Sequence, residues 1–150
     1  MTSLTRLVTL LALLAFGAAF APAKDGRDFA GFYSLDAGSP EGGQVHVTLT
    51  LQVFNYSGAD LEQATLALRS GPPEDVTFAT YDAIREWRDG ADVRLAMHFT
   101  VPQEVYERWR GRRQPAIVIM NRDQQGQALE RLVQASRRTG IDLSERRPAE

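Results

Sequence analysis

The residues best suited to recognition chemistry lie in residues 106–113, where two aromatic side chains alternate with arginines. Rings beside guanidinium groups can stack on sugars or hold an acidic protein surface. The opposite interpretation is that Trp109, together with Val105, closes an open end of the core, because large aromatic side chains are usually buried. We favour burial for Trp109. The candidate partner-binding residues are Tyr106, Arg108, Trp109, Arg110, Arg112 and Trp87.

Two histidines, His46 and His98, stand at polar positions of two segments with strand-like alternation. If these segments are neighbours in one sheet, both imidazoles project from one surface and could share a metal ion, with Asp92 or Glu41 as a third ligand. Two histidines without a defined carboxylate make a poor site, so two solvated side chains are the plainer interpretation. The sequence therefore predicts no metal and no cofactor.

No set of catalytic residues stands out. Nucleophilic catalysis needs a nucleophile beside a base that a third group orients, and the chain has neither a cysteine nor a Gly-x-Ser-x-Gly sequence. A His-Glu-x-x-His sequence is absent, and Lys24 has no glycine-rich phosphate loop beside it. Glu104 and Glu107 share a helical face, but they are better placed to pair with nearby arginines than to flank a sugar cleft. We predict that the protein is not an enzyme.

The N-terminus has the order of a secretory signal peptide. Arg6 precedes an apolar run over 7–20, and Ala21-Pro22-Ala23 then places small residues for cleavage. The run is shorter than the ~20 residues that span a bilayer, which favours cleavage over a retained anchor. We predict removal of residues 1–23 and a periplasmic or extracellular location, with membrane attachment only through an uncleaved signal segment.

Net charge, cysteine content and length limit the possible classes of protein further. The formal charge of −2 argues against nucleic-acid binding, which needs clustered positive charge. An exported chain without cysteines has no disulfides, so packing alone must hold its fold. The length suits one domain, which we place at residues 24–138. Residues 139–150 are charged and poor in apolar side chains, so we predict a disordered tail there.

Two segments carry clear strand signals. In residues 45–53 and again in 93–101, apolar side chains occupy every second position, which puts them on one face of a strand. Weaker signals mark residues 29–35, 64–69, 76–80 and 116–120, and residues 81–88 fit either a strand or a helical turn. Asn55-Tyr56-Ser57 matches a glycosylation sequon, but a turn is the commoner reason for this tripeptide.

One short helix is predicted over residues 102–110. Pro102 suits a first helical position, Val105 and Trp109 share a face four residues apart, and Gly111 ends the segment.

The segment at residues 128–135 gives mixed signals. Its apolar residues have helical spacing and Gly140 would serve as a C-cap, yet the strand at 116–120 needs a neighbour. We predict a strand, with a helix as the alternative.

Frequent strands, short turns and the lack of βαβ alternation favour an all-β fold. We predict an antiparallel two-sheet sandwich of about seven strands, with one short helix before the penultimate strand. The stretches VHVTLTLQVFNYSG (45–58), ATLAL (64–68), FTVP (99–102) and PAIVI (115–119) resemble Ig-like or fibronectin-III-like β-sandwich domains of secreted bacterial proteins.

That resemblance implies a binding or structural module and carries no catalytic residue. The expected function is protein interaction or structural support in the cell envelope, with an envelope or secreted protein as partner. The alternative is a small carbohydrate-binding module that holds a glycan on exposed Trp87, Tyr106 or Trp109.

Overall fold

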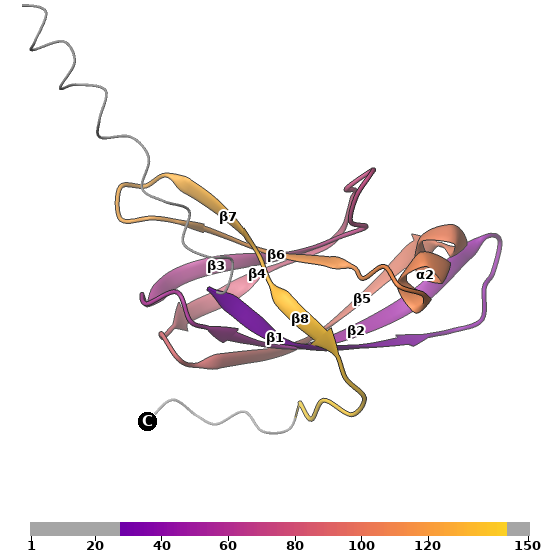
Figure 1. The fold of residues 1–150 in the computed structure, drawn as a ribbon, viewed down its shortest axis with the longest axis horizontal. Coiled ribbons are helices and arrows are strands. Elements are labelled where there is room, and N and C mark those ends of the chain that lie inside the picture. The colour runs from indigo at the N-terminus through magenta and orange to yellow at the C-terminus, as the bar shows by residue number, and fades with distance from the viewer. Residues whose placement is uncertain (1–27, 144–150) are drawn as a thin grey trace, which may run out of the picture.

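The computed structural model describes residues 28–143. These residues form eight strands and one short helix, and the strands make two four-stranded sheets that pack together (Figure 1). Sheet A has the order β5-β2-β1-β8, and sheet B has the order β4-β3-β6-β7. The predicted all-β class with two packed sheets is confirmed. The bounds are β1 (Phe29–Ala37), β2 (Gln44–Asn55), β3 (Leu61–Arg69), β4 (Thr77–Trp87), β5 (Asp92–Pro102), α2 (Gln103–Arg110), β6 (Ala116–Arg122), β7 (Ala128–Leu132) and β8 (Gln134–Arg137).

The two strongly alternating segments are neighbours in sheet A. β2 and β5 pair antiparallel from Gln44 opposite Pro102 to Phe54 opposite Asp92. The alternating apolar side chains of β2 are buried between the sheets, while His46 and most other polar positions face outward. The period of two therefore predicted the buried face correctly, because successive strand side chains point to opposite faces.

Sheet B builds its half of the core from β3 and β6. Leu66 and Leu68 on β3 are buried together with Ile117 and Ile119 on β6. Val118 lies between Ile117 and Ile119, so its side chain points to the opposite face of β6, and it is buried as well. This burial on both faces explains the continuous apolar run that predicted a covered central strand.

The ambiguous segment before residue 88 is a strand. β4 pairs antiparallel with β3, but its register shifts between Ala64 and Leu66 on the partner strand. Within β4, only Ile84 and Trp87 are fully buried, and they are three residues apart. The bulged pairing changes the spacing of buried residues, so the segment lacks a clean period of two.

The last predicted strand is divided between the two sheets, which corrects the expected total of seven strands. β7 pairs antiparallel with β6, and the buried Val133 then donates its N–H to the Ile117 carbonyl at 2.8 Å. β8 continues as a parallel partner of β1, with Ala30 opposite Gln134. Three strands rather than two therefore follow α2. The strand interpretation of this segment is confirmed and the helical alternative is wrong, because extended chain gives both β6 and β1 a hydrogen-bonded neighbour.

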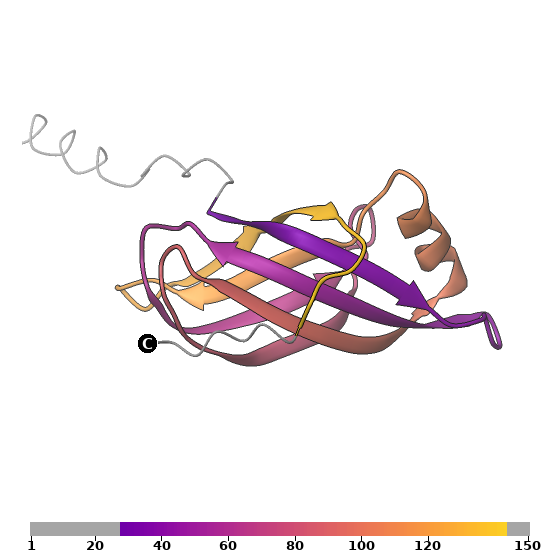
Figure 2. The same cartoon turned by 90° about the horizontal axis from the view of Figure 1, so that it is seen from below.

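The chain after β8 crosses the outer face of sheet A (Figure 2). Arg138 donates its N–H to the Tyr33 carbonyl at 2.8 Å, and Arg94 on β5 donates to the Asp142 carbonyl at 3.0 Å. The predicted tail has neither helix nor strand in residues 139–143, and its remainder lies outside the described residues.

The predicted signal segment also lies outside the described residues. Within residues 28–143, no helix is long and apolar enough to cross a membrane.

Candidate functional site

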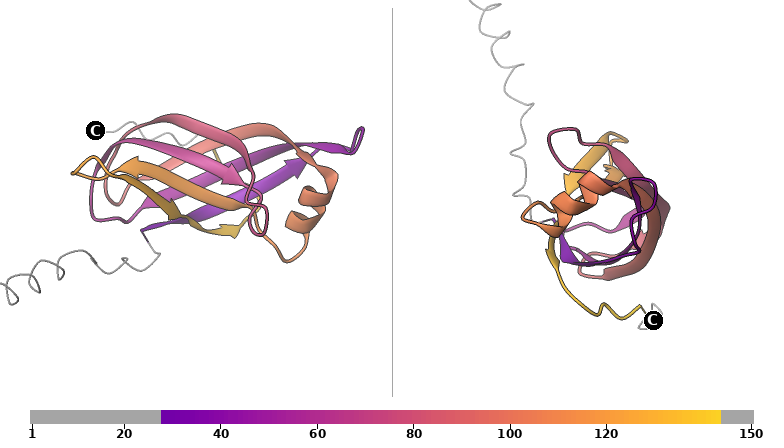
Figure 3. Two further views of the ribbon diagram at one scale, coloured as in Figure 1. Left: turned by 90° about the horizontal axis from the view of Figure 1, so that it is seen from above. Right: turned by 90° about the vertical axis from the view of Figure 1, so that its right-hand side faces the viewer.

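The helix α2 lies across one end of the sandwich, as the end-on view in Figure 3 shows. It follows Pro102 directly, and Val105 and Trp109 are its buried residues. Glu104 in the first turn and the arginines in the last turn have the signs that the helix dipole favours. The predicted helix and its buried face are confirmed, so α2 presents its arginines outward from a fixed position.

Trp109 belongs to the core. Its side chain is 1% exposed, and its Nε1–H donates to the Ser70 carbonyl at 3.1 Å. The ring meets Phe78 of sheet B and Phe99 of sheet A edge-on, with centroids 5.9 Å and 6.3 Å away. This geometry satisfies the indole inside the protein. Trp109 is therefore not available as an exposed partner-binding residue, and the expected burial is correct.

Trp87 is buried at the opposite end of the sandwich. It is 2% exposed, packs 5.4 Å from the ring of Phe29, and donates its Nε1–H to the Ala91 carbonyl at 3.0 Å. The expectation that Trp87 joins an exposed aromatic surface is wrong, because its position at the end of β4 places the ring in the core. The structure does not bring Trp87 together with the residues of α2.

The remaining candidates of α2 do lie together at the surface. Tyr106 is half-buried and packs against the core, while Arg110 and Arg112 are exposed. Arg110 pairs with Glu107 one turn earlier at 3.6 Å. We call the surface formed by Tyr106, Arg108, Arg110, Arg112 and Arg113 the arginine end.

A shallow pocket of about 520 Å³ lies beside this surface. Arg108 and Arg113 line it together with Gln114 and the loop that follows β3. Arg108 donates to the Glu74 carboxylate at 3.0 Å, and this hydrogen bond lowers the pKa of Glu74 below its ordinary value. Arg113 donates to the Pro72 carbonyl at 3.5 Å. Sequence reasoning missed Arg113 as a pocket residue, because only the fold brings residues 70–73 to α2.

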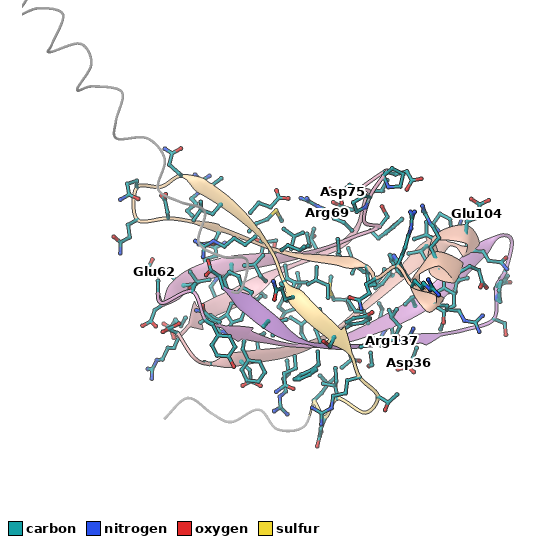
Figure 4. The ribbon with its side chains drawn as sticks, viewed as in Figure 1. Asp36, Glu62, Arg69, Asp75, Glu104 and Arg137 are labelled. Atoms are coloured by element: carbon teal, nitrogen blue, oxygen red, sulfur yellow. The ribbon has the colours of Figure 1, made fainter. Side chains whose placement is uncertain are left out.

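The charged residues around the arginine end come from both α2 and the loop between β3 and β4. Figure 4 places Glu104 on the outer side of α2, Arg69 at the end of β3, and Asp75 nearby in the loop that leads to β4. Arg69 pairs with Asp75 at 3.6 Å and also with Glu130 of β7. Arg112 is exposed beside these pairs.

The two histidines lie on the outer face of sheet A. They line a groove of about 470 Å³ together with Asp36, Thr48 and Thr100. Neither residue considered as a third ligand for a shared metal lies in this groove. Asp92 is opposite Phe54, six residues along β5 from His98, and it accepts hydrogen bonds from Gln52 and Arg94. Glu41 does not line the groove.

Among residues 28–143, no group of three or more His, Cys, Asp or Glu side chains is arranged to hold a metal ion. Both imidazoles nevertheless lie on the same outer face of sheet A and line the same groove, as the sequence predicted for adjacent strands.

A larger groove of about 910 Å³ runs over β3, β6 and β7. Its carboxylates belong to Asp60, Glu62, Asp123 and Glu130, and Arg122 also lines it. Arg122 already donates to the Gly126 carbonyl, and Glu130 pairs with Arg69. Sequence reasoning gave no signal for this groove, since its residues come from three separate segments that only the fold brings together.

Comparison of the chain with protein-family models, curated proteins and solved structures finds no match. The fold and the surfaces described above therefore carry the functional conclusions.

Proposed function

We propose that the chain is an exported, non-enzymatic Ig-like β-sandwich domain that binds a protein partner in the cell envelope through its arginine end. The strand order supports an Ig-like topology: β1, β2 and β5 share one sheet, while β3, β6 and β7 share the other. In constant-type immunoglobulin domains the fourth strand pairs within the first sheet, whereas β4 here pairs with β3. This order therefore agrees with an Ig-like sandwich in which the fourth strand has changed sheets.

The observation that carries the proposal is the exposure of several arginines on a rigid support. Arg110, Arg112 and Arg113 are all exposed at the end of α2, and the buried Trp109 anchors that helix to both sheets. Arginine is enriched at energetically important positions of protein interfaces, and its fork of donors matches a carboxylate. An acidic protein surface is the partner that this chemistry fits best.

Charge reversal tests the proposal. The full chain, a variant with Arg110→Glu, Arg112→Glu and Arg113→Glu, and a control with Arg85→Glu and Arg88→Glu at the other end are each immobilised and exposed to an envelope fraction. A partner recovered with the wild-type chain is purified and its dissociation constant is measured. We expect the arginine-end variant to weaken binding at least tenfold, because like charges then face each other. The control should bind normally.

The binding should also weaken as salt increases, since exposed charges are screened. A partner lost only from the control variant would place the interface elsewhere, and the absence of any saturable protein partner would contradict the proposal. Circular dichroism checks that all three proteins share the same fold.

A carbohydrate-binding function is the second candidate, and one surface feature favours it. Tyr56 is 54% exposed, and its ring lies parallel to that of Phe54 with 5.7 Å between the centroids. Tyr56 directly follows β2, and an exposed aromatic ring there can stack on a sugar. If this function is correct, Tyr56→Ala should abolish binding to a glycan array while Tyr106→Ala retains it. Equal binding by both variants would contradict a role for this ring pair.

A further inference from the structure

The outer face of sheet A carries the pattern His-x-Thr twice. His46-Val47-Thr48 lies on β2 and His98-Phe99-Thr100 lies on β5. The antiparallel register places His46 opposite Thr100 and Thr48 opposite His98. Each histidine therefore faces the threonine of the other strand, and the four side chains form a nearly two-fold arrangement. We call these four residues the His-Thr cluster.

Both imidazoles are held in the same way. The His46 Nδ1 is 3.0 Å from the Thr100 Oγ1, and the His98 Nδ1 is 3.0 Å from the Thr48 Oγ1. A hydrogen bond at one ring nitrogen fixes the orientation of the ring and the nitrogen that remains for a ligand. When Nδ1–H donates to the hydroxyl, the Nε2 of the neutral ring carries a free lone pair. Metal-binding histidines are oriented by such outer hydrogen bonds.

The cluster is open to solvent and to a ligand. Both histidines are exposed, and both line the groove of about 470 Å³ on this face. Asp36, at the end of β1, lines the same groove and is in register with Thr48, which in turn is in register with His98. Figure 4 shows Asp36 on the lower side of the molecule, at the same end of the sandwich as α2. Its carboxylate adds negative charge beside the two imidazoles.

We propose that the His-Thr cluster is a binding site for one divalent transition-metal ion, held by the Nε2 atoms of His46 and His98 and completed by water. Because no group of three protein ligands is arranged to hold a metal within residues 28–143, at least two coordination positions stay open to solvent or an external ligand. Imidazole ligands suit copper, nickel and zinc, and Cu²⁺ binds most tightly of these to a given nitrogen site. Mg²⁺ prefers oxygen ligands and should not bind. This site is independent of the arginine end.

Calorimetry with a tag-free full-length chain provides the first test. We expect one Cu²⁺ ion per chain, weaker binding of Zn²⁺ and no measurable binding of Mg²⁺. A double variant, His46→Gln with His98→Gln, should lose at least 100-fold in Cu²⁺ affinity. Each of Thr48→Val and Thr100→Val should lose about tenfold, as expected for an outer hydrogen-bond partner. Thr65→Val on sheet B is the matched control and should bind like the wild type.

Two measurements on the wild-type chain keep the test independent of the variants. The electron paramagnetic resonance spectrum of the Cu²⁺ complex should show coupling to two imidazole nitrogens. In a two-dimensional amide NMR spectrum, substoichiometric Cu²⁺ should broaden residues 46–48 and 98–100 before any others. Unchanged Cu²⁺ affinity in the double histidine variant, coupling to a single nitrogen, or broadening centred elsewhere would each overturn the proposal.

Discussion

Asn55 is the polar side chain on which the turn between β2 and β3 depends. It is fully buried, and its Nδ2 donates to the Ala59 carbonyl at 2.9 Å and to the Trp87 carbonyl at 3.2 Å. Its Oδ1 accepts from the N–H and the hydroxyl of Ser57. This explains the sequon-like tripeptide as a turn, as the sequence predicted. In the folded domain the nitrogen that a glycan would need is already enclosed.

We predict that Asn55→Ala lowers the free energy of unfolding by about 3 kcal/mol, because the Ala59 and Trp87 carbonyls each lose a donor and the Ser57 N–H loses its acceptor inside the protein. Ser57→Ala removes a smaller part of the same network and should cost about 1 kcal/mol. Urea unfolding followed by tryptophan fluorescence measures both. Equal stabilities of the Asn55 variant and the wild type would show that the network contributes nothing.

Gly31 is the position of β1 at which a side chain would collide with the backbone of β2. A Cβ built at this position would lie 1.9 Å from the Gln52 carbonyl oxygen, whereas a Cβ at Gly38 meets nothing within 4 Å. Backbone atoms on the neighbouring strand cannot rotate away as a side chain can, so the strands would have to separate.

We predict that Gly31→Ala lowers the free energy of unfolding by at least about 3 kcal/mol, at the upper end of overpacking effects. Gly38→Ala is the matched control and should change it by less than about 0.5 kcal/mol. Chemical unfolding of the two variants side by side provides the comparison. If the Gly31→Ala variant is as stable as the control, β1 and β2 are not so close.

Two buried side chains, Val105 and Trp109, hold the helix α2 against the sandwich, and Trp109 is the larger. Trp109 connects the helix to the Ser70 carbonyl and to phenylalanines of both sheets. In the sequence, Pro102, Gly111 and the four-residue spacing of Val105 and Trp109 were enough to predict the helix, because these signals are local.

Trp109→Ala should lower the free energy of unfolding by about 4 kcal/mol through loss of a large buried ring. Trp109→Phe, which keeps a ring but not the N–H donor, should cost about half as much, and Arg112→Ala should cost less than about 0.5 kcal/mol. Denaturant titration measures all three. In the wild type, acrylamide should quench neither indole efficiently; strong quenching would contradict the burial of Trp87 and Trp109.

The strands that the sequence predicted less well are those whose pairing is irregular. The bulged pairing of β4 interrupts its alternation of buried and exposed residues. The apolar residues of 128–135 have helix-like spacing because the chain passes from one sheet to the other at Val133. Such features depend on neighbours far away in the sequence, so a local pattern does not report them. The arginines of α2 were identified from sequence, but their pocket with residues 70–73 was not.

The free energy of unfolding should decrease at both high and low pH. Tyr33 contributes to the decrease at high pH. Burial raises its pKa above the ordinary value, although nearby Arg137 opposes this. A raised pKa in the folded state means that stability is fully present below about pH 10 and is lost as pH rises further. We predict that Tyr33→Phe flattens the decline of the melting temperature as pH rises above about 10. An unchanged decline in this variant would contradict the assignment.

Asp92 contributes to the decrease of stability at low pH. Partial burial raises its pKa, but hydrogen bonds from Gln52 and Arg94 outweigh this and lower the pKa below its ordinary value. A lowered pKa gives stability that is present above about pH 4 and is lost as pH falls further. We expect Asp92→Asn to be less stable than the wild type at neutral pH and to approach it on acidification. Melting curves between about pH 2.5 and 7 test this, and a constant difference would contradict it.

The sequence by itself determined the local features of this protein: the buried faces of β2 and β5, the inner face and the last residue of α2, and the lack of thiol chemistry. Pro102, predicted as the first helical residue, is instead the N-cap at the end of β5. Alternation and helical spacing report which side of an element is apolar, because that depends only on backbone geometry. Only the tertiary structure decided which strands are neighbours and in what register. The register of β2 and β5 places each histidine opposite a threonine of the other strand. The division of the last predicted strand between two sheets and the burial of Trp87 also depend on contacts between residues far apart in the sequence, so no local pattern predicts them.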